Sequence, residues 1–392
     1  MAADRGRKRP DLTGKAAASE AVAGEASRRV ALDAIIRINE KGAYANLVLS
    51  ELLDRSGLGG EDRRFVTELV YGSTRMRRAC AYLADRFVIG DVDPEVRAAL
   101  QIGAYQLAFL NTPPHAAVSA TVGAVRSRGR SLVNAVLRKV ASAPIQYPDL
   151  ATELSYPDWL MNRVSDFLGP VRAEKALREM NRPAETAVRD DGYIQDPASQ
   201  MVIDVVAAQP GDVVVDLCAA PGGKATGMAA TGVLVIAADR RRSRARLIAA
   251  NSERLGRPIP ILVADGRQPA IRPGMVDKVL VDAPCSGLGS LRRRPDARWR
   301  IEPEAASRLA ELQLELLVAG YDLLKPGGEL TYSVCTLDRA EGPDVVEGLR
   351  RVRPDVRFKE PPGSPWEIIE SMAVLVPSDH DGMMLAQMVK PT

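Results

Sequence analysis

After Pro210 the sequence repeats one alternation, in which a short run of β-branched and aliphatic residues is followed by a helical stretch. The runs expected to be strands are 213–217, 233–238, 259–263, 276–281 and 329–333, and the amphipathic helices between them include 244–255 and 305–324. Such alternation predicts a mostly parallel sheet with helices on both faces. Because ligands of these α/β, Rossmann-like sheets bind outside the carboxyl ends of the strands, the alternation also predicts where a site must lie.

The part of the chain before this region follows a helical period instead. Apolar residues such as Val30, Ala34 and Ile38 recur at helix spacing, and the pattern continues to Ala143 with short Gly- and Pro-containing interruptions. This pattern predicts an all-α bundle of five to seven helices. We therefore expect a disordered basic tail at 1–26, a helical domain at 27–143, a connector with two helices at 144–194, and the α/β domain at 195–392.

Charge is distributed unevenly along the chain. The net charge is only +3, but residues 1–145 hold 22 Lys and Arg against 15 Asp and Glu, which leaves 31 against 35 for the remainder. A basic first third favours contact with phosphate groups. With no long apolar run, no secretory signal, and four well-separated cysteines, the sequence predicts a cytoplasmic protein without membrane spans, disulfides or a bound metal. We expect a monomer, although no sequence pattern indicates the oligomeric state.

Four successive strands are expected to end in an acidic residue. The acids are Asp216, Asp239, Asp265 and Asp282, and the first is followed by a small-residue and glycine-rich turn. The turn matches neither a dinucleotide fingerprint nor a phosphate-binding loop of nucleotide triphosphatases. An adenosine with a charged amino-acid tail fits better, with Asp239 on the ribose, Asp265 on the adenine amino group, and Asp216 or Asp282 near the tail and sulfonium.

Two of the four cysteines, Cys285 and Cys335, are placed at strand ends beside this pocket, whereas Cys80 and Cys218 are interpreted as small core residues. A thiolate is among the few side-chain groups nucleophilic enough to add to a pyrimidine ring. Carbon 5 of cytosine reacts poorly with a sulfonium methyl group until a nucleophile adds at carbon 6. Two thiols beside a methyl donor therefore indicate covalent catalysis on an unstacked base.

Several stretches resemble one known family closely. They are DRRFVTELVYGSTR at 62–75, PPHAAV at 113–118, LVNAVLR at 132–138, QDPASQ at 195–200, DLCAAPGGK at 216–224, DAPCSG at 282–287, KPGG at 325–328, YSVCT at 332–336 and DGMMLA at 381–386. The chain resembles the Sun/Fmu-type bacterial 16S rRNA cytosine-5 methyltransferases with a NusB-like N-terminal domain. The similarity covers nearly all of the chain after the tail.

The resemblance implies a class I methyltransferase domain that uses S-adenosyl-L-methionine, preceded by an RNA- or ribosome-facing helical domain. It implies Cys335 as the nucleophile and Cys285 as the residue that assists product release. Asp282 is implied to lie near the base as well as the cofactor. The implied cofactor-binding residues are Cys218, Ala219, Ala220, Pro221, Gly222, Gly223, Lys224, Asp239, Asp265 and Asp282.

The sequence departs from the family pattern at three places. The family has fifty or more residues between the equivalents of Pro183 and Gln195, forming a small RNA-contacting subdomain, and here only residues 184–194 remain. Val334 replaces the usual Thr, and Glu341-Gly342-Pro343 stands where a Glu-Asn pair is typical. An Arg-rich loop with Trp299 is expected to contact RNA in compensation; its basic residues are Arg292, Arg293, Arg294, Arg298 and Arg300.

Three other interpretations remain open from the sequence. Pro284-Cys285 resembles the Pro-Cys nucleophile of DNA cytosine methyltransferases, which would exchange the roles of the two thiols. The shortened connector is compatible with a non-catalytic RNA-binding or ribosome assembly factor. The same fold also serves methyl transfer to proteins and small molecules.

Overall fold

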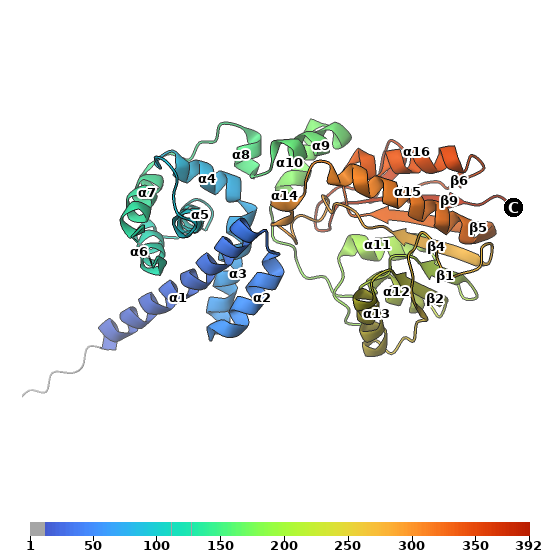
Figure 1. Cartoon of the computed structure of the whole chain (residues 1–392), viewed down its shortest axis with the longest axis horizontal. Coiled ribbons are helices and arrows are strands. Elements are labelled where there is room, and N and C mark those ends of the chain that lie inside the picture. Colours follow the sequence, from blue (N-terminus) through green and yellow to red (C-terminus); the bar gives the residue numbers. More distant parts are fainter. Residues whose placement is uncertain (1–11, 111, 127) are drawn as a thin grey trace, which may run out of the picture. The chain divides into compact units, whose positions relative to one another are not determined.

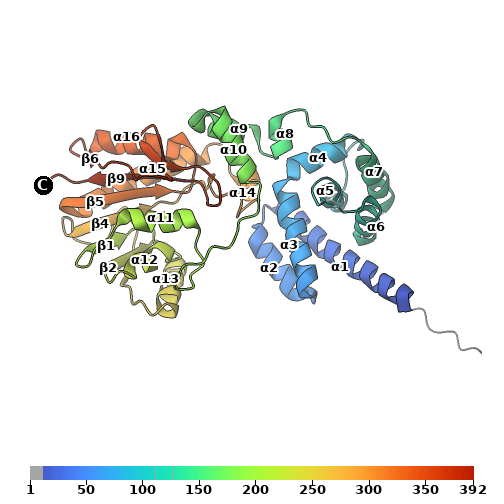
Figure 2. The same ribbon diagram turned by 180° about the vertical axis from the view of Figure 1, so that it is seen from behind.

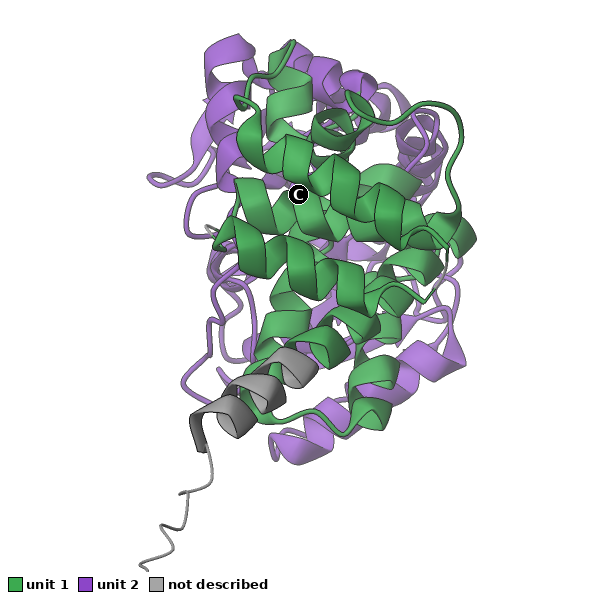
Figure 3. Ribbon diagram, turned by 90° about the vertical axis from the view of Figure 1, so that its left-hand side faces the viewer, with its two compact units in different colours: residues 1–157, 294–300 green, residues 158–293, 301–392 purple. Residues whose placement is uncertain are grey.

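The computed structural model describes residues 12–110, 112–126 and 128–392, with side chains described from residue 24 onward. The chain forms two compact units, which Figure 3 colours separately. The first unit contains residues 1–157 and 294–300, and the second contains residues 158–293 and 301–392. The first boundary falls inside the stretch expected to be a connector. Every helix within the described ranges is too short or too polar to span a bilayer.

The first unit is all-helical, as predicted. Its helices are α1 (Leu12–Lys41), α2 (Ala45–Ser56), α3 (Gly60–Arg75), α4 (Arg77–Asp85), α5 (Pro94–Ala108), α6 (Pro114–Ala124), α7 (Arg130–Ser142), α8 (Leu150–Leu154) and the short α14 (Ala297–Arg300). Helix α5 is central and contacts α1, α3, α4, α6 and α7. Gly103 on α5 allows this packing, because a Cβ atom there would lie 2.4 Å from a methyl carbon of Leu137.

Helix α1 begins at Leu12, within the segment expected to be a disordered tail, while residues 1–11 lie outside the described part of the chain. The expectation of disorder up to residue 26 is therefore wrong for its second half. Six alanines between residues 16 and 26 give this stretch a high helix propensity, which outweighs its polar character. Past it, Ser27 bonds Asp62 at 2.8 Å and Arg28 bonds Gln106 at 2.8 Å, which ties α1 to α3 and α5.

The second unit is built on one mixed sheet. Its strands are β1 (Val213–Asp216), β2 (Leu234–Asp239), β3 (Ile261–Val263), β4 (Val276–Asp282), β5 (Leu324–Val334), β6 (Arg357–Phe358), β7 (Glu367–Ile369), β8 (Met372–Leu375) and β9 (Met383–Val389). The order is β3-β2-β1-β4-β5-β9-β8-β7, with β6 on β9. Strands β1 to β5 are parallel and β9 joins β5 antiparallel. The predicted α/β fold is confirmed, with an antiparallel extension.

Helices cover both faces of this sheet (Figures 1 and 2). Helices α11 (Pro197–Val206), α12 (Gly223–Ala229) and α13 (Arg242–Arg254) lie on one face, and α15 (Ala305–Leu323) and α16 (Pro343–Val352) lie on the other. The period of two along β4 shows why: Leu280 packs with the α11–α13 layer, while Val279 and Val281 meet Gly320 of α15. The two expected connector helices are α9 (Asp158–Leu168) and α10 (Pro170–Glu179).

Candidate active site

The sheet places the candidate site at a topological switch point. From β1 the chain continues to β2 and β3 on one side, whereas β4 and β5 lie on the other side of β1. Loops leaving β1 and β4 at their carboxyl ends therefore diverge and leave a crevice between them. Asp216 ends β1, Asp239 ends β2, and Asp282 ends β4, while Asp265 follows β3 by two residues. The structure thus brings all four predicted acids to one edge.

Two cavities open at this edge. One, of about 320 Å³, has Asp239 and Asp265 on one side and an apolar wall from α15 on the other, which includes Leu309, Leu312 and Leu316. The second, of about 290 Å³, holds polar groups from several elements. Its lining includes Ser199, Asp216, Lys224, Asp282 and Cys335. The predicted cofactor residues line these two cavities or form the turn beside them.

The turn after β1 is held in a compact shape by its own backbone. The Gly222 N–H donates to the Ala219 carbonyl at 2.6 Å, and Gly222 has φ +105°, which favours glycine. A Cβ atom on Gly223 would meet the Tyr193 ring at 3.0 Å and the Gln195 amide at 3.2 Å. The glycines of the motif are therefore required by local crowding, in addition to any contact with a ligand.

The remnant of the connector supports this turn. Arg189 donates to the Gly223 carbonyl at 2.5 Å and to the Thr226 hydroxyl at 3.2 Å, and it pairs with Asp191 at 2.7 Å. Its guanidinium also lies 4.7 Å from the centre of the Tyr193 ring. Residues 184–194 are thus used internally, to anchor the first turn of α12. No sequence pattern indicates this role, because Arg189 is separated by more than thirty positions from Gly223 and Thr226.

Lys224 and Asp282 form a partly buried ion pair in the second cavity. Their Nζ and Oδ2 atoms are 2.7 Å apart, and the other oxygen of Asp282 accepts a hydrogen bond from the Ser333 hydroxyl at 2.8 Å. Burial lowers the pKa of Lys224, but Asp282 opposes this effect and the net pKa is raised. Lys224 is therefore a fixed positive charge beside Cys335.

Asp216 is buried without full compensation. Its side chain is 1% exposed; one oxygen accepts a hydrogen bond from the Cys218 N–H at 3.3 Å, and the other has no hydrogen-bond partner among the residues that the structure describes. Burial, together with the negative charge of Asp282, raises the pKa of Asp216 to about 7. A buried acceptor left unpaired is costly unless a donor or a cation reaches it. The arrangement suits a cationic group bound in this cavity.

Asp239 and Asp265 differ in how free their carboxylates are. Asp239 is 5% exposed and accepts a hydrogen bond from the Arg241 N–H at 2.9 Å. Asp265 is held by Arg267 through two side-chain contacts of 2.8 and 3.0 Å, which lower its pKa to about 2. Asp239 is the better placed of the two for hydroxyl groups, because Arg267 already occupies both oxygens of Asp265.

The two predicted thiols lie side by side. Strands β4 and β5 are parallel neighbours in which Asp282 is opposite Ser333, so Cys285 and Cys335 leave adjacent strand ends. Their Sγ atoms are 3.3 Å apart. The hydrogen bond from the Cys285 thiol lowers the pKa of Cys335, with help from Lys224, and the same contact together with burial raises the pKa of Cys285. Cys335 is therefore the better thiolate of the pair.

A single buried carboxylate joins the two cysteine loops. Glu341 has no exposed surface and accepts hydrogen bonds from the backbone N–H and the hydroxyl of Ser286, the former at 2.8 Å. It also accepts from the Thr336 hydroxyl at 3.1 Å and the Gln313 amide at 3.0 Å. Ser286 follows one cysteine and Thr336 follows the other. Burial raises the pKa of Glu341. The sequence marked Glu341 only as a departure from the family pattern.

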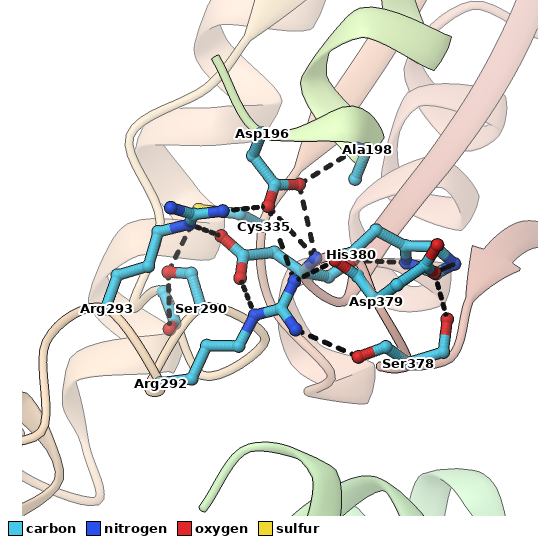
Figure 4. A network of polar contacts seen from close by, with 11 residues as sticks. Asp196, Ala198, Ser290, Arg292, Arg293, Cys335, Ser378, Asp379 and His380 are labelled. Atoms are coloured by element: carbon cyan, nitrogen blue, oxygen red, sulfur yellow. Dashed lines mark hydrogen bonds and ion pairs between the residues drawn. The ribbon is translucent and has the colours of Figure 1, made fainter. Parts of the chain in front are cut away.

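An arginine–aspartate network fixes the far end of the Cys285 loop (Figure 4). Arg292 contacts Asp381 at 2.7 Å, and Arg293 contacts Asp381 at 3.0 Å and Asp196 at 2.5 Å. Asp196 also caps α11 by accepting from the Ala198 N–H at 2.9 Å. The loop after β4, the start of α11 and the chain before β9 are thereby joined by charge-assisted hydrogen bonds.

Most arginines of the Arg-rich loop pair with groups of the protein itself, and two of them, Arg292 and Arg298, are buried, against the expectation that they contact RNA. Besides Arg292 and Arg293, Arg298 is completely buried in the helical unit, 3.9 Å from the centre of the Tyr156 ring. The Trp299 indole N–H donates to the Thr74 carbonyl at 2.7 Å, and Arg300 pairs with Asp296 at 2.8 Å. Except for Asp296, the partner of Arg300, these partners are distant in sequence, so the run of arginines had the pattern of a solvated surface. Arg294 is exposed.

Replacing Glu341 with Gln should weaken this part of the molecule. The amide keeps the shape of the side chain but presents donors to groups that are themselves donors. We expect the free energy of unfolding to fall by about 1–3 kcal/mol, as when buried hydrogen-bonding groups lose partners. We also expect iodoacetamide to label Cys335 more slowly at pH 7. A loosened loop would move the Cys285 thiol away from Cys335, and the hydrogen bond from Cys285 stabilises the Cys335 thiolate.

The matched control is Glu347→Gln on α16, whose contacts with Arg350 and Arg351 are exposed to solvent. It should change the unfolding free energy by no more than about 0.5 kcal/mol. Chemical denaturation and mass spectrometry of the labelled protein measure the two effects. Equal behaviour of the two variants would show that Glu341 has no special part in holding the thiols.

Comparisons with known proteins agree with both units. The family described as 16S rRNA methyltransferase RsmB/F matches residues 203–389, and the NusB family matches residues 25–142. A probable ribosomal RNA small subunit methyltransferase B from Synechocystis sp. is 30% identical over 93% of this chain and 99% of its own length. The ribosomal RNA small subunit methyltransferase B of Thermus thermophilus is 34% identical over 87% of this chain and 91% of its own length.

One solved structure extends the similarity to the fold. The crystal structure of PH0851 has a TM-score of 0.75 with this chain, at 23% sequence identity, and covers 93% of this chain and 99% of that one. Together with the two family matches and the relatives, these similarities show that the chain belongs to the RsmB/F family of 16S rRNA methyltransferases and joins a NusB-family helical domain to an S-adenosylmethionine-dependent methyltransferase domain.

Proposed function

We propose that the chain is an RNA (cytosine-5) methyltransferase that acts on 16S rRNA through a covalent adduct with Cys335. The observation that carries the proposal is the pair of thiols, 3.3 Å apart, at the edge of a cavity that also holds Asp216, Lys224 and Asp282. A methyltransferase that modifies a nitrogen or an oxygen has no use for two adjacent cysteines at this place. The names of the Synechocystis and Thermus relatives support ribosomal RNA as the substrate.

The residues present suit S-adenosyl-L-methionine. The oxygen of Asp216 that lacks a hydrogen-bond partner in the described part of the chain offers a counter-charge for a cation. The apolar wall opposite Asp239 offers space for a flat ring, and the hydroxyls of a sugar attached to that ring would reach the Asp239 carboxylate. The small residues of the turn from Cys218 to Gly223 would let the ligand approach the backbone closely. When bound, S-adenosylmethionine supplies an electrophilic methyl group to the reaction.

Cys335 starts the reaction as a thiolate that attacks carbon 6 of an unstacked cytosine. The new S–C6 bond converts the ring to an enamine-like adduct, and carbon 5 then accepts the methyl group. The proton on carbon 5 passes to a base, the C5–C6 double bond forms again, and the S–C6 bond breaks to release Cys335 as a thiolate. Cys285 assists this last step by donating its thiol hydrogen bond to the departing sulfur.

The remaining interpretations of the sequence differ from this proposal in testable ways. If Cys285 were the nucleophile, it should line the cavity that holds Asp216, Lys224 and Asp282, whereas Cys335 is the cysteine that lines this cavity. A non-catalytic assembly factor would have no need for an unpaired buried carboxylate beside two reactive thiols. The shortened connector motivated the assembly-factor interpretation, but its Arg189 forms hydrogen bonds with α12 and so has a structural role.

Trapping on RNA tests the role of each thiol. An oligonucleotide of 16S rRNA sequence containing 5-fluorocytosine should form a stable adduct with the wild-type protein, because fluorine cannot leave carbon 5 as a cation. We expect Cys335→Ser to form no adduct, Cys285→Ser to retain it, and Cys80→Ala, a change in the helical core, to behave as the wild type. Denaturing gel electrophoresis measures the adduct.

Two outcomes would overturn the assignment. An adduct that survives Cys335→Ser but not Cys285→Ser would make Cys285 the nucleophile. A folded wild-type protein that binds S-adenosylmethionine but leaves every cytosine unmodified, as judged by bisulfite sequencing of rRNA from cells with and without the gene, would favour the assembly factor.

The pKa of Asp216 predicts how cofactor affinity changes with pH. At pH 6 this carboxyl is mostly protonated, since its pKa is raised to about 7, and at pH 8 it is mostly ionised. A cationic ligand prefers the ionised form, so Asp216 should strengthen binding by about tenfold between these pH values. Calorimetry of S-adenosylmethionine binding measures the change.

Asp216→Asn isolates this contribution, because other titrating groups, including the amino group of the ligand, remain in both proteins. The ratio of wild-type to variant affinity should rise between pH 6 and pH 8. Asp212→Asn, on the surface before β1, should leave the ratio flat. A ratio that does not change for Asp216→Asn would show that this carboxylate does not face the positive charge of the ligand.

A further inference from the structure

The helical unit contains a cavity that has no part in the site described above. It lies between α6 and α7, which run side by side in Figures 1 and 2, and has a volume of about 780 Å³. We call it the α6–α7 groove. Its lining residues are Pro114, His115, Val118, Ser119, Val122, Arg130, Ser131, Asn134, Arg138 and Ala141.

The groove belongs to a stretch of unusual charge. Between residues 96 and 148 the sequence contains six Arg and Lys and no Asp or Glu. The chain as a whole has nearly balanced charges, 53 basic against 50 acidic, so this imbalance is local. Arg97 pairs with Asp85, but the other five positive residues, between 126 and 139, have no acidic neighbour in sequence, so any compensation must come from elsewhere in the fold.

One arginine outside the groove has an acidic partner, whereas the two arginines that line the groove have none among the described residues. Arg126 pairs with Asp33 at 3.2 Å. Arg130 donates only to backbone carbonyl groups, those of Val125 at 2.6 Å and Gly123 at 3.3 Å. Neither Arg130 nor Arg138 forms an ion pair within the described part of the chain, and both are exposed. Two guanidinium groups on the groove therefore keep their full positive charge.

The remaining lining residues indicate what kind of anion would fit. Val118, Val122 and Ala141 provide apolar surface between the helices, while Ser119, Ser131 and Asn134 supply hydroxyl and amide groups. His115 adds an exposed ring on the same groove. A free phosphate or sulfate has no use for apolar surface, whereas a nucleic acid strand presents phosphates, ribose hydroxyls and flat bases together.

We propose that the α6–α7 groove binds the backbone of single-stranded or looped RNA, with Arg130 and Arg138 on phosphates and His115 beside a base. The proposal rests on the proposed function, since the RNA is the substrate that carries the target cytosine. It identifies the residues of the helical unit that would bind this substrate. The lined part of α6, from Pro114 to Val122, is about 13 Å long at 1.5 Å per residue, which limits the contact to a few nucleotides.

The test compares RNA binding by the full chain and by matched variants. Fluorescence anisotropy with a labelled 16S rRNA fragment gives the dissociation constant at several salt concentrations. For the double variant Arg130→Gln and Arg138→Gln we expect binding about tenfold or more weaker at low salt. We also expect the slope of log affinity against log salt to fall by about 1–2, because two phosphate contacts are lost.

Two further variants separate binding from folding. Arg130 supports the turn between the helices through its carbonyl contacts, so Arg138→Gln, combined with His115→Ala, removes groove groups without breaking any described internal bond. Arg126→Gln removes one positive charge that is already paired with Asp33 and should have a much smaller effect. Circular dichroism and thermal melting establish that each variant is folded.

Binding and catalysis give separate readouts. S-adenosylmethionine affinity should be unchanged in every groove variant, and the KM for RNA should rise while kcat at saturating RNA stays within about twofold of the wild type. If the wild type binds RNA but does not methylate it, the proposed function fails while the groove can still be tested by anisotropy. Groove variants that bind RNA as tightly and with the same salt slope as Arg126→Gln would overturn the groove proposal, including the case in which they lose an acidic protein partner instead.

Discussion

The chemistry of this protein depends on the parallel pairing of β4 and β5. Their register sets Asp282 opposite Ser333, and each strand is followed within three residues by a cysteine. A shift of this register by one residue would turn one thiol to the other face of the sheet. The contact between Cys285 and Cys335, which are fifty positions apart in the sequence, therefore depends on the hydrogen bonds that pair two neighbouring strands. Glu341 and the arginine–aspartate network then fix the loops that the sheet has brought together.

The same edge of the sheet concentrates charges that do not balance by themselves. Asp216 and Asp282 bring two carboxylates to one cavity, where Lys224 forms an ion pair with Asp282 and only partly offsets the charge of Asp216. The low dielectric of the interior makes this costly in the free protein and favourable when a cation binds. The partly compensated carboxylate thus lowers the stability of the free protein, and a bound cation would restore it. The fixed ammonium of Lys224 also favours the thiolate form of Cys335, so one lysine connects the proposed cofactor cavity with the proposed nucleophile.

Much of the second unit follows from sequence patterns. The five expected parallel strands are all present, and the acids and thiols lie where their positions at strand ends predict, because strand period and strand direction are local properties. The role of Glu341 was not predictable, since a buried carboxylate is recognised by its partners and three of these come from other elements. The expectation that Arg292 and Arg298 contact RNA was wrong for the same reason. Composition describes them as surface residues, whereas Asp381 and Tyr156, far away in sequence, provide the compensation that permits their burial.

The source of RNA affinity follows from which positive charges remain uncompensated. Arg292 and Arg293 are neutralised by Asp196 and Asp381, and Arg189 of the connector is neutralised by Asp191. These arginines stabilise the methyltransferase domain and have little charge left for a phosphate backbone. Arg130 and Arg138, in contrast, lie in a stretch without a single acidic residue. The helical unit therefore offers positive charge for RNA, while the two thiols lie beside the sheet of the methyltransferase domain.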